Sequence, residues 1–135
     1  MKVFVSHARK DSLLASQLAE QLSHGGFSVW LPDEHISLGD NWAKKVGKAL
    51  EDSEFMVVLL TPKALDSDSV RQDIEFALGS RKYEGRVLSV FVGPTTREGK
   101  DIPWILLKLP HCRIPSAEGF DEVVKELQSL APTPR

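Results

Sequence analysis

The sequence predicts an α/β protein with a flavodoxin-like fold, in which five parallel strands form one sheet in the order 2-1-3-4-5 and helices cover both faces. Apolar runs of strand length alternate with amphipathic helical segments, which is typical of βαβ units. Two of the runs, FMVVLLT (55–61) and RVLSVFVG (86–93), are apolar at nearly every position, as in internal strands covered on both faces. The length of 135 residues suits one domain with a single sizeable core.

The chain begins with a β-branched and aromatic run, KVFVS (2–6), which predicts the first strand. A helix is expected next, because leucines recur at every fourth position from Leu14 to Leu22 and therefore share one helix face. Asp11 or Ser12 is suited to cap the start of this helix.

The second strand is expected at FSVWL (27–31), and a polar loop with proline and glycine follows at PDEHISLGD (32–40). Asp40 is expected to cap a second helix. The apolar stripe of this helix contains Val46, Ala49 and Leu50.

After the third strand, a third helix is expected from Asp66 to Lys82. Its buried stripe is predicted to contain Val70, Ile74, Ala77 and Leu78. HCRI (111–114) is suited to an edge strand, and FDEVVKELQSLA (120–131) to a last amphipathic helix. We therefore expect one domain over residues 1–131, with 132–135 as a tail or the stub of a linker.

Composition argues against several classes of function. Seventeen basic and nineteen acidic residues give a net charge of -2, so no broad basic face is expected for nucleic acid or anionic lipid. A single cysteine excludes an internal disulfide framework, and the four histidines lack metal-ligand spacing. No apolar run approaches the roughly 20 residues of a membrane span, and no signal peptide pattern is present. We expect a cytoplasmic protein without a metal or a membrane segment.

The strand order predicts where a ligand binds. Doubly wound sheets bind ligands beyond the carboxyl ends of their strands. The site is therefore expected among SHARKD (6–11), the loop at 32–40 and the start of the third helix. The glycine patterns that hold pyrophosphate in Rossmann and P-loop proteins are absent from the sequence.

Several stretches resemble, in order, the signature boxes of bacterial Toll/interleukin-receptor (TIR) domains. They are MKVFVSHARKD, GFSVWLPDEHISLGDNW, EFMVVLLTPKAL, VRQDIEFALGSRKYEGRVLSVFVG and IPWILLKL. The resemblance covers nearly the whole chain. It implies a five-stranded flavodoxin-like fold, self-association through the loop from Pro32 to Asp40, and cleavage of NAD, which is a substrate here and not a cofactor.

The resemblance also implies a catalytic residue. The family's catalytic Glu lies in the pattern Trp-x-x-x-Glu at the start of the third helix, and alignment on VRQDIEFAL places that Glu at Asp73 and that Trp at Ser69. At about 100° per residue, Ser69, Asp73 and Phe76 share a ridge beside the buried stripe. Glu75 points to the other flank. Asp73 is therefore the candidate catalytic carboxylate. Its side chain is shorter than that of the family's Glu.

Other residues are candidates for binding NAD. Ser6, His7 and Arg9 follow the first strand, where Arg9 is suited to a phosphate and His7 to ribose. Where the family has Trp, Ser69 offers no aromatic face for nicotinamide to stack on. Trp30 or Phe76 can compensate by stacking on nicotinamide instead.

Each of these residues also has a simpler interpretation. A lone surface Arg is commonly solvated, and Trp is commonly buried. Acidic residues in the first turns of a helix favour its dipole by about 0.3–1 kcal/mol without any catalysis, which accounts for Asp73 about as well as a catalytic role does.

Two functions therefore stay open. The first is an NAD glycohydrolase or ADP-ribosyl cyclase, which releases nicotinamide and forms ADP-ribose or a cyclic ADP-ribose signal in antiphage defence. The second is a TIR interaction module with little or no catalysis, which acts by self-assembly. The retained SHARKD stretch, Trp30 and the acid at position 73 favour the enzyme.

Overall fold

The computed structural model describes residues 1–31, 39, 41–61, 64, 67–93 and 108–130. Within them one sheet is formed by β1 (Lys2–Ser6), β2 (Ser28–Trp30), β3 (Phe55–Leu60), β4 (Val87–Val92) and β5 (His111–Ile114). The strand order is β2-β1-β3-β4-β5, and every pairing is parallel. The predicted fold class and strand order are confirmed, and β3 and β4 are internal strands with every residue buried.

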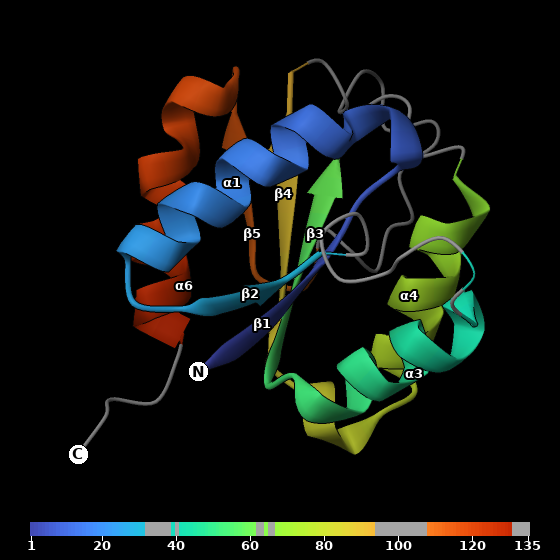
Figure 1. The fold of residues 1–135 in the computed structure, drawn as a ribbon. Coiled ribbons are helices and arrows are strands. Elements are labelled where there is room, and N and C mark those ends of the chain that lie inside the picture. The colour runs from blue at the N-terminus through green and yellow to red at the C-terminus, as the bar shows by residue number, and fades with distance from the viewer. Residues whose placement is uncertain (32–38, 40, 62–63, 65–66, 94–107, 131–135) are drawn as a thin grey trace.

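In the described residues, four helices cover the two faces of the sheet, as can be followed in Figure 1. One face carries α1 (Ser12–His24) and α6 (Phe120–Leu130), and the other carries α3 (Trp42–Asp52) and α4 (Asp68–Leu78). Side chains of β1 alternate between the two faces, so Val3 and Val5 join the core under α1 and α6 while Phe4 joins the core under α3 and α4. Three 3-10 turns complete the described elements: η1 (Arg9–Asp11), η3 (Arg81–Tyr83) and η5 (Ala117–Gly119).

The core under α1 and α6 is closely packed. Leu18 and Leu22, from the predicted leucine stripe, are fully buried. At the end of α1, a Cβ atom on Gly25 would lie 2.5 Å from Cγ1 of Val124 on α6, and the side chain of Gln128 donates to the Gly25 carbonyl at 3.0 Å. A side chain at position 25 would therefore force Val124 or one of these two helices to shift.

The core under α3 and α4 uses the predicted stripe of the third helix in part. Val70, Ile74 and Ala77 are buried against the sheet. Leu78 was predicted to belong to this stripe, but it is 45% exposed. The helix ends at Leu78, so its last side chain lies beyond the covered part of the sheet.

Two predicted helix boundaries are corrected, namely the end of α4 and the start of α3. The third helix was expected to reach Lys82, but Gly79 caps it and η3 forms a separate turn. The cap of α3 is Asn41, whose Oδ1 accepts from the Lys44 amide at 3.1 Å, and not Asp40. Asn and Asp cap helices about equally well, so the residue next to the first turn makes the bond.

Asp11 takes the N-cap position of α1, as one of the two predicted alternatives, but its side chain does not cap the helix. Its carboxylate instead accepts a hydrogen bond of 2.5 Å from Oγ1 of Thr61, at the end of β3. Asp11 and Thr61 are both buried. The segment after β1 is therefore attached to the end of β3.

The expected domain boundary at residue 131 and the loop from Pro32 to Asp40, apart from Gly39, lie outside the described residues. In the part of the chain that the structure describes, no helix has the length and apolar character needed to cross a bilayer.

Candidate functional site

A pocket of about 440 Å³ opens at the carboxyl end of β1, and residues of α3 and α4 contribute to its lining. Its volume falls within the roughly 300–1,000 Å³ that is typical of ligand sites. The segment after β1 and the first turns of α4 line it, as the sequence predicted. These elements supply its polar residues, which are Ser6, His7, Arg9, Ser69, Gln72 and Asp73.

Asp73 lies on the second turn of α4, and the N-cap of this helix sets where the turn begins. The helix begins after Ser67, whose side chain accepts from the Val70 amide at 3.3 Å. With the buried stripe of α4 turned toward the sheet, Asp73 lies beside it and is partly buried. Oγ of Ser6, the last residue of β1, donates to Oδ2 of Asp73 at 2.7 Å. This distance is typical of a hydroxyl bound to a carboxylate.

Burial raises the pKa of Asp73 from 3.8 to about 6, because an ionised carboxylate loses hydration there. The hydrogen bond from Ser6 and the positive charge of His7 lower this pKa, but they offset only part of the effect of burial. At neutral pH the group is therefore ionised and held in surroundings that solvate it poorly. Strongly shifted carboxylates in a cleft are typical of functional sites.

His7 and Arg9 lie at the rim formed by the segment after β1. Nδ1 of His7 donates to the carbonyl of Ala8 at 2.8 Å, and Nε2 is buried with no hydrogen-bond partner among the described residues. The side chain of Arg9 is exposed at the start of η1 and lines the pocket. The pocket therefore has a cationic group at its rim and a carboxylate within it.

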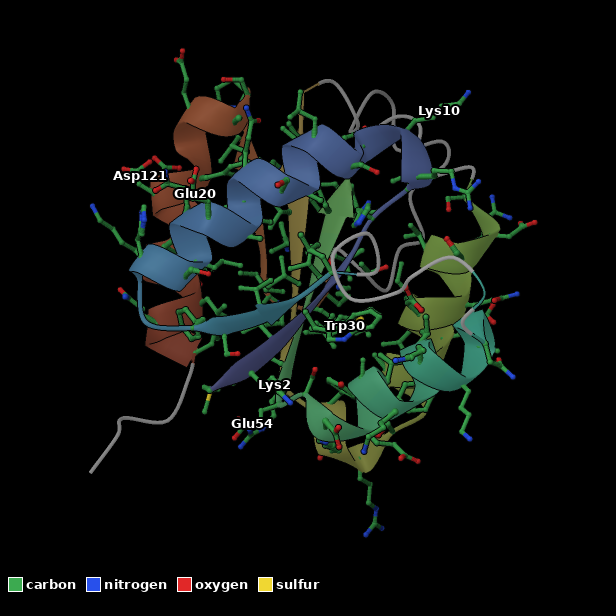
Figure 2. All side chains as sticks on the ribbon, in the orientation of Figure 1. Lys2, Lys10, Glu20, Trp30, Glu54 and Asp121 are labelled. Atoms are coloured by element: carbon green, nitrogen blue, oxygen red, sulfur yellow. The ribbon has the colours of Figure 1, made fainter. Side chains whose placement is uncertain are left out.

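Trp30 and Phe76 do not line the pocket. Trp30 lies on the side of the sheet covered by α3 and α4 (Figure 2). Its ring stacks on Phe4, with centroids 5.2 Å apart and planes 12° apart, and Phe4 does line the pocket. Trp30 therefore packs against a residue that lines the pocket. The stacking of Trp30 on nicotinamide stays a prediction.

Phe76 shares the direction of Ser69 and Asp73 but lies farther along α4. At 1.5 Å per residue it is about 4.5 Å beyond Asp73 along the helix axis. Its side chain is 44% exposed and meets the ring of Tyr83 edge to face, at 6.1 Å between centroids. Its predicted contact with NAD also stays a prediction.

Tyr83 joins the two helices that border the pocket. Its hydroxyl donates to the carbonyl of Leu50 at 2.6 Å, so η3, which follows α4, is bonded to α3. Burial, and then the nearby charge of Asp73, raise the pKa of Tyr83 to about 12. The hydroxyl therefore keeps its proton and the bond at physiological pH.

One wall of the pocket was missed by sequence reasoning. Ala43, Val46, Gly47 and Leu50 line the pocket from α3. Their spacing of three and four residues places them on one helix face, which signals an apolar stripe but not a cavity beside it. Gln72 was missed as well. Among the described residues, no three side chains of His, Cys, Asp or Glu gather to form a metal site.

A family model described as the TIR domain matches residues 3–124. An NAD(+) hydrolase of a Theionarchaea archaeon is 29% identical over 128 residues, which are 93% of this chain and 38% of the hydrolase. A 2′ cyclic ADP-D-ribose synthase of Bacteroides thetaiotaomicron is 33% identical over 60 residues, or 44% of this chain and 21% of the synthase. The chain thus spans less than two fifths of the length of either relative.

Two solved structures share the fold. A metazoan TIR-STING receptor from C. gigas, in complex with 2′,3′-cGAMP, superposes with a TM-score of 0.77 at 16% identity, over 93% of this chain and 38% of the receptor chain. A 2-deoxyribosyltransferase from Bacillus psychrosaccharolyticus gives a TM-score of 0.62 at 17% identity, over 100% of this chain and 99% of the transferase chain. At these identities the likeness concerns the fold alone.

Proposed function

The chain belongs to the TIR domain family, and from this premise we propose that it cleaves the bond between nicotinamide and ribose in NAD. The observation that carries the proposal is the Asp73 carboxylate, which is partly buried in the pocket and held by Ser6 at 2.7 Å. The relatives named as an NAD(+) hydrolase and a cyclic ADP-D-ribose synthase support the same chemistry.

This reaction requires little more than one well-placed carboxylate. Nicotinamide is cationic in NAD, and when its bond to ribose breaks it keeps the electron pair and departs neutral, so no general acid is needed. Positive charge develops on the ribose, as in glycoside hydrolysis, and Asp73 is placed to stabilise it. Ser6 fixes the direction of the carboxylate. Water then adds to the ribose and loses a proton, which gives ADP-ribose; attack by the adenine of the same molecule gives a cyclic product.

The other polar residues of the pocket suit the rest of the substrate. Arg9, at the rim, is suited to a phosphate of the dinucleotide, because a guanidinium pairs with two phosphate oxygens at once. His7 and Ser69 border the same pocket and are suited to the hydroxyls of ribose. No metal or further cofactor has a part in this proposal.

The direct test measures free nicotinamide after the protein is incubated with NAD at high protein concentration. Asp73→Asn keeps the size of the side chain and removes its charge, so we expect release to fall at least a hundredfold. Glu75→Gln is the matched control, because Glu75 is exposed on the same helix and does not line the pocket. Equal rates for the parent and Asp73→Asn would remove Asp73 from the mechanism.

The second candidate is an interaction module with little or no catalysis. It is favoured by Asp73 and Ser69, because the family resemblance places Glu and Trp at these two positions. An Asp side chain is shorter than Glu by about 1.5 Å, and misplacement of this order can lower a rate about a hundredfold. We expect Asp73→Glu to raise NAD cleavage, and more so together with Ser69→Trp. If neither the parent nor this double variant releases nicotinamide, the interaction module is preferred.

We further propose that the protein acts in antiphage signalling in the cytoplasm, and that copies associate through the loop at 32–40. The support is the family resemblance together with the apolar residues Ile36 and Leu38 in an otherwise polar loop. Association should increase with protein concentration. Light scattering of the parent and of Ile36→Asp checks this, and unchanged association in the variant would make the loop only a connector.

A further inference from the structure

The pocket has two walls of different chemistry. The wall formed by the end of β1 and by α4 contains hydroxyl, imidazole, guanidinium, amide and carboxylate groups. The wall formed by α3 contains only Ala43, Val46, Gly47 and Leu50 among the described lining residues. Hydrogen bonds to the sugars and phosphates of a dinucleotide are therefore available on the first wall, and apolar contact on the second.

Gly47 is an unexpected residue in this second wall. It lies in the interior of α3, where glycine destabilises a helix by roughly 0.5–1 kcal/mol relative to alanine. Its backbone does not require glycine, since its φ lies outside the left-handed region. Packing among the described residues does not require it either, because a Cβ built on Gly47 meets none of their heavy atoms within 4 Å, whereas one on Gly25 would lie 2.5 Å from Val124.

With respect to the described residues, the space next to Gly47 is therefore open, and Gly47 lines the pocket. A planar heteroaromatic ring presents a broad apolar face, which a wall of small apolar residues can contact closely. A side chain at position 47 would stand between such a ring and the helix backbone. Glycine thus allows the closest approach of a flat group to α3, at a cost to the helix that nothing in the described residues offsets.

We infer that Gly47 determines which base the pocket accepts, and that the nicotinamide ring of the substrate lies flat against α3 at this residue. The inference rests on the proposed cleavage of NAD. It divides the substrate between the two walls: ribose and phosphates meet the wall with Asp73 and Arg9, and the departing ring meets the wall with Gly47.

The experiment compares Gly47→Leu with Lys48→Leu, which adds the same side chain to the next position of α3, where the native side chain is 77% exposed and does not line the pocket. Nicotinamide and ADP-ribose are titrated separately by calorimetry or NMR. We expect Gly47→Leu to weaken nicotinamide binding at least tenfold and to change ADP-ribose binding less than threefold, and Lys48→Leu to change neither. Gly47→Ala should raise the unfolding temperature and also raise the KM for NAD severalfold.

The outcomes separate this inference from the proposed function. If the parent releases nicotinamide from NAD but Gly47→Leu binds nicotinamide as tightly as the parent, the inference is overturned and the function stands. Weakened binding of ADP-ribose alone would place adenine at Gly47 and would also overturn it. A parent that neither binds nor cleaves NAD removes both proposals. If Gly47→Leu does not fold, the KM of Gly47→Ala decides, and an unchanged KM rejects the inference.

Discussion

The two faces of the sheet use side chains of the same strands in different ways. Under α1 and α6 a large apolar cluster is buried, and Gly25 lies where these two helices pack closely together. Under α3 and α4 a pocket opens beside the apolar cluster at the carboxyl end of β1, and it contains a carboxylate with a raised pKa. The face under α1 and α6 is thus closely packed, whereas the face under α3 and α4 has a cavity next to the Asp73 carboxylate.

The largest expected effect lies on the α1 and α6 face. Leu18 is fully buried there, so Leu18→Ala should lower the free energy of unfolding by about 2–5 kcal/mol. Urea denaturation measures this loss, and Leu13→Ala on the exposed side of the same helix is the control. NAD cleavage per folded molecule should stay unchanged. A fall in activity beyond the fall in folded fraction would show that the two faces are coupled.

The next effect concerns the charge of the pocket. A carboxyl whose pKa is higher in the folded chain than in the unfolded chain holds its proton more tightly when folded, so stability falls as pH rises from about 4 through about 6. For Asp73, a pKa of about 6 in place of 3.8 corresponds to about 3 kcal/mol lost by pH 7. Asp73→Asn should therefore gain stability relative to the parent across this interval. Urea denaturation at several pH values checks this, and a constant difference between the two proteins would refute it.

Glycines on the two faces should respond in opposite directions. Gly25→Ala places a methyl group against Val124, so we expect a loss of about 1–3 kcal/mol in the free energy of unfolding. Gly47→Ala should instead stabilise the protein by about 0.5–1 kcal/mol, because its methyl group enters open space. Thermal unfolding of both variants distinguishes these signs. Changes of the same sign would mean that the space beside Gly47 is not open in solution.

The smallest effect concerns the partner of the carboxylate. Ser6 lowers the pKa of Asp73 by its hydrogen bond, so Ser6→Ala should raise that pKa. If ionised Asp73 is required for cleavage, activity falls at acid pH with a midpoint near 6, and the variant should move this midpoint upward by about one pH unit. The pH profile of nicotinamide release measures the shift. Ser6→Thr, which keeps a hydroxyl, should restore most of the original profile.

Much of the fold follows from patterns that a single sequence contains. The run FMVVLLT has the length of a strand and apolar residues throughout, so it could only be an internal strand. Boundaries were harder, because they depend on which of two adjacent capping residues makes a bond. Asp40 and Asn41 are equally good caps, and only the position of the first turn of α3 decides between them.

The site was predictable where topology alone brings residues together. Ser6, His7, Arg9, Ser69 and Asp73 meet because the segment after β1 and the start of α4 lie at the same edge of a parallel sheet. The α3 wall was not predictable in this way. Val46 and Leu50 form an apolar stripe, and helical spacing does not distinguish a stripe that packs against a core from one that borders a cavity.

The hydrogen bond from Tyr83 to the Leu50 carbonyl holds η3 against α3 at one end of the pocket. Leu50 lies near the end of α3, whereas Ala43 lies in its first turn, so among the described residues this bond acts at the Leu50 end of the cavity. Small rotations of α3 about this bond would change the width at Ala43 far more than at Leu50. We therefore expect the width of the pocket to vary less at Leu50 than at Ala43 when a ligand binds.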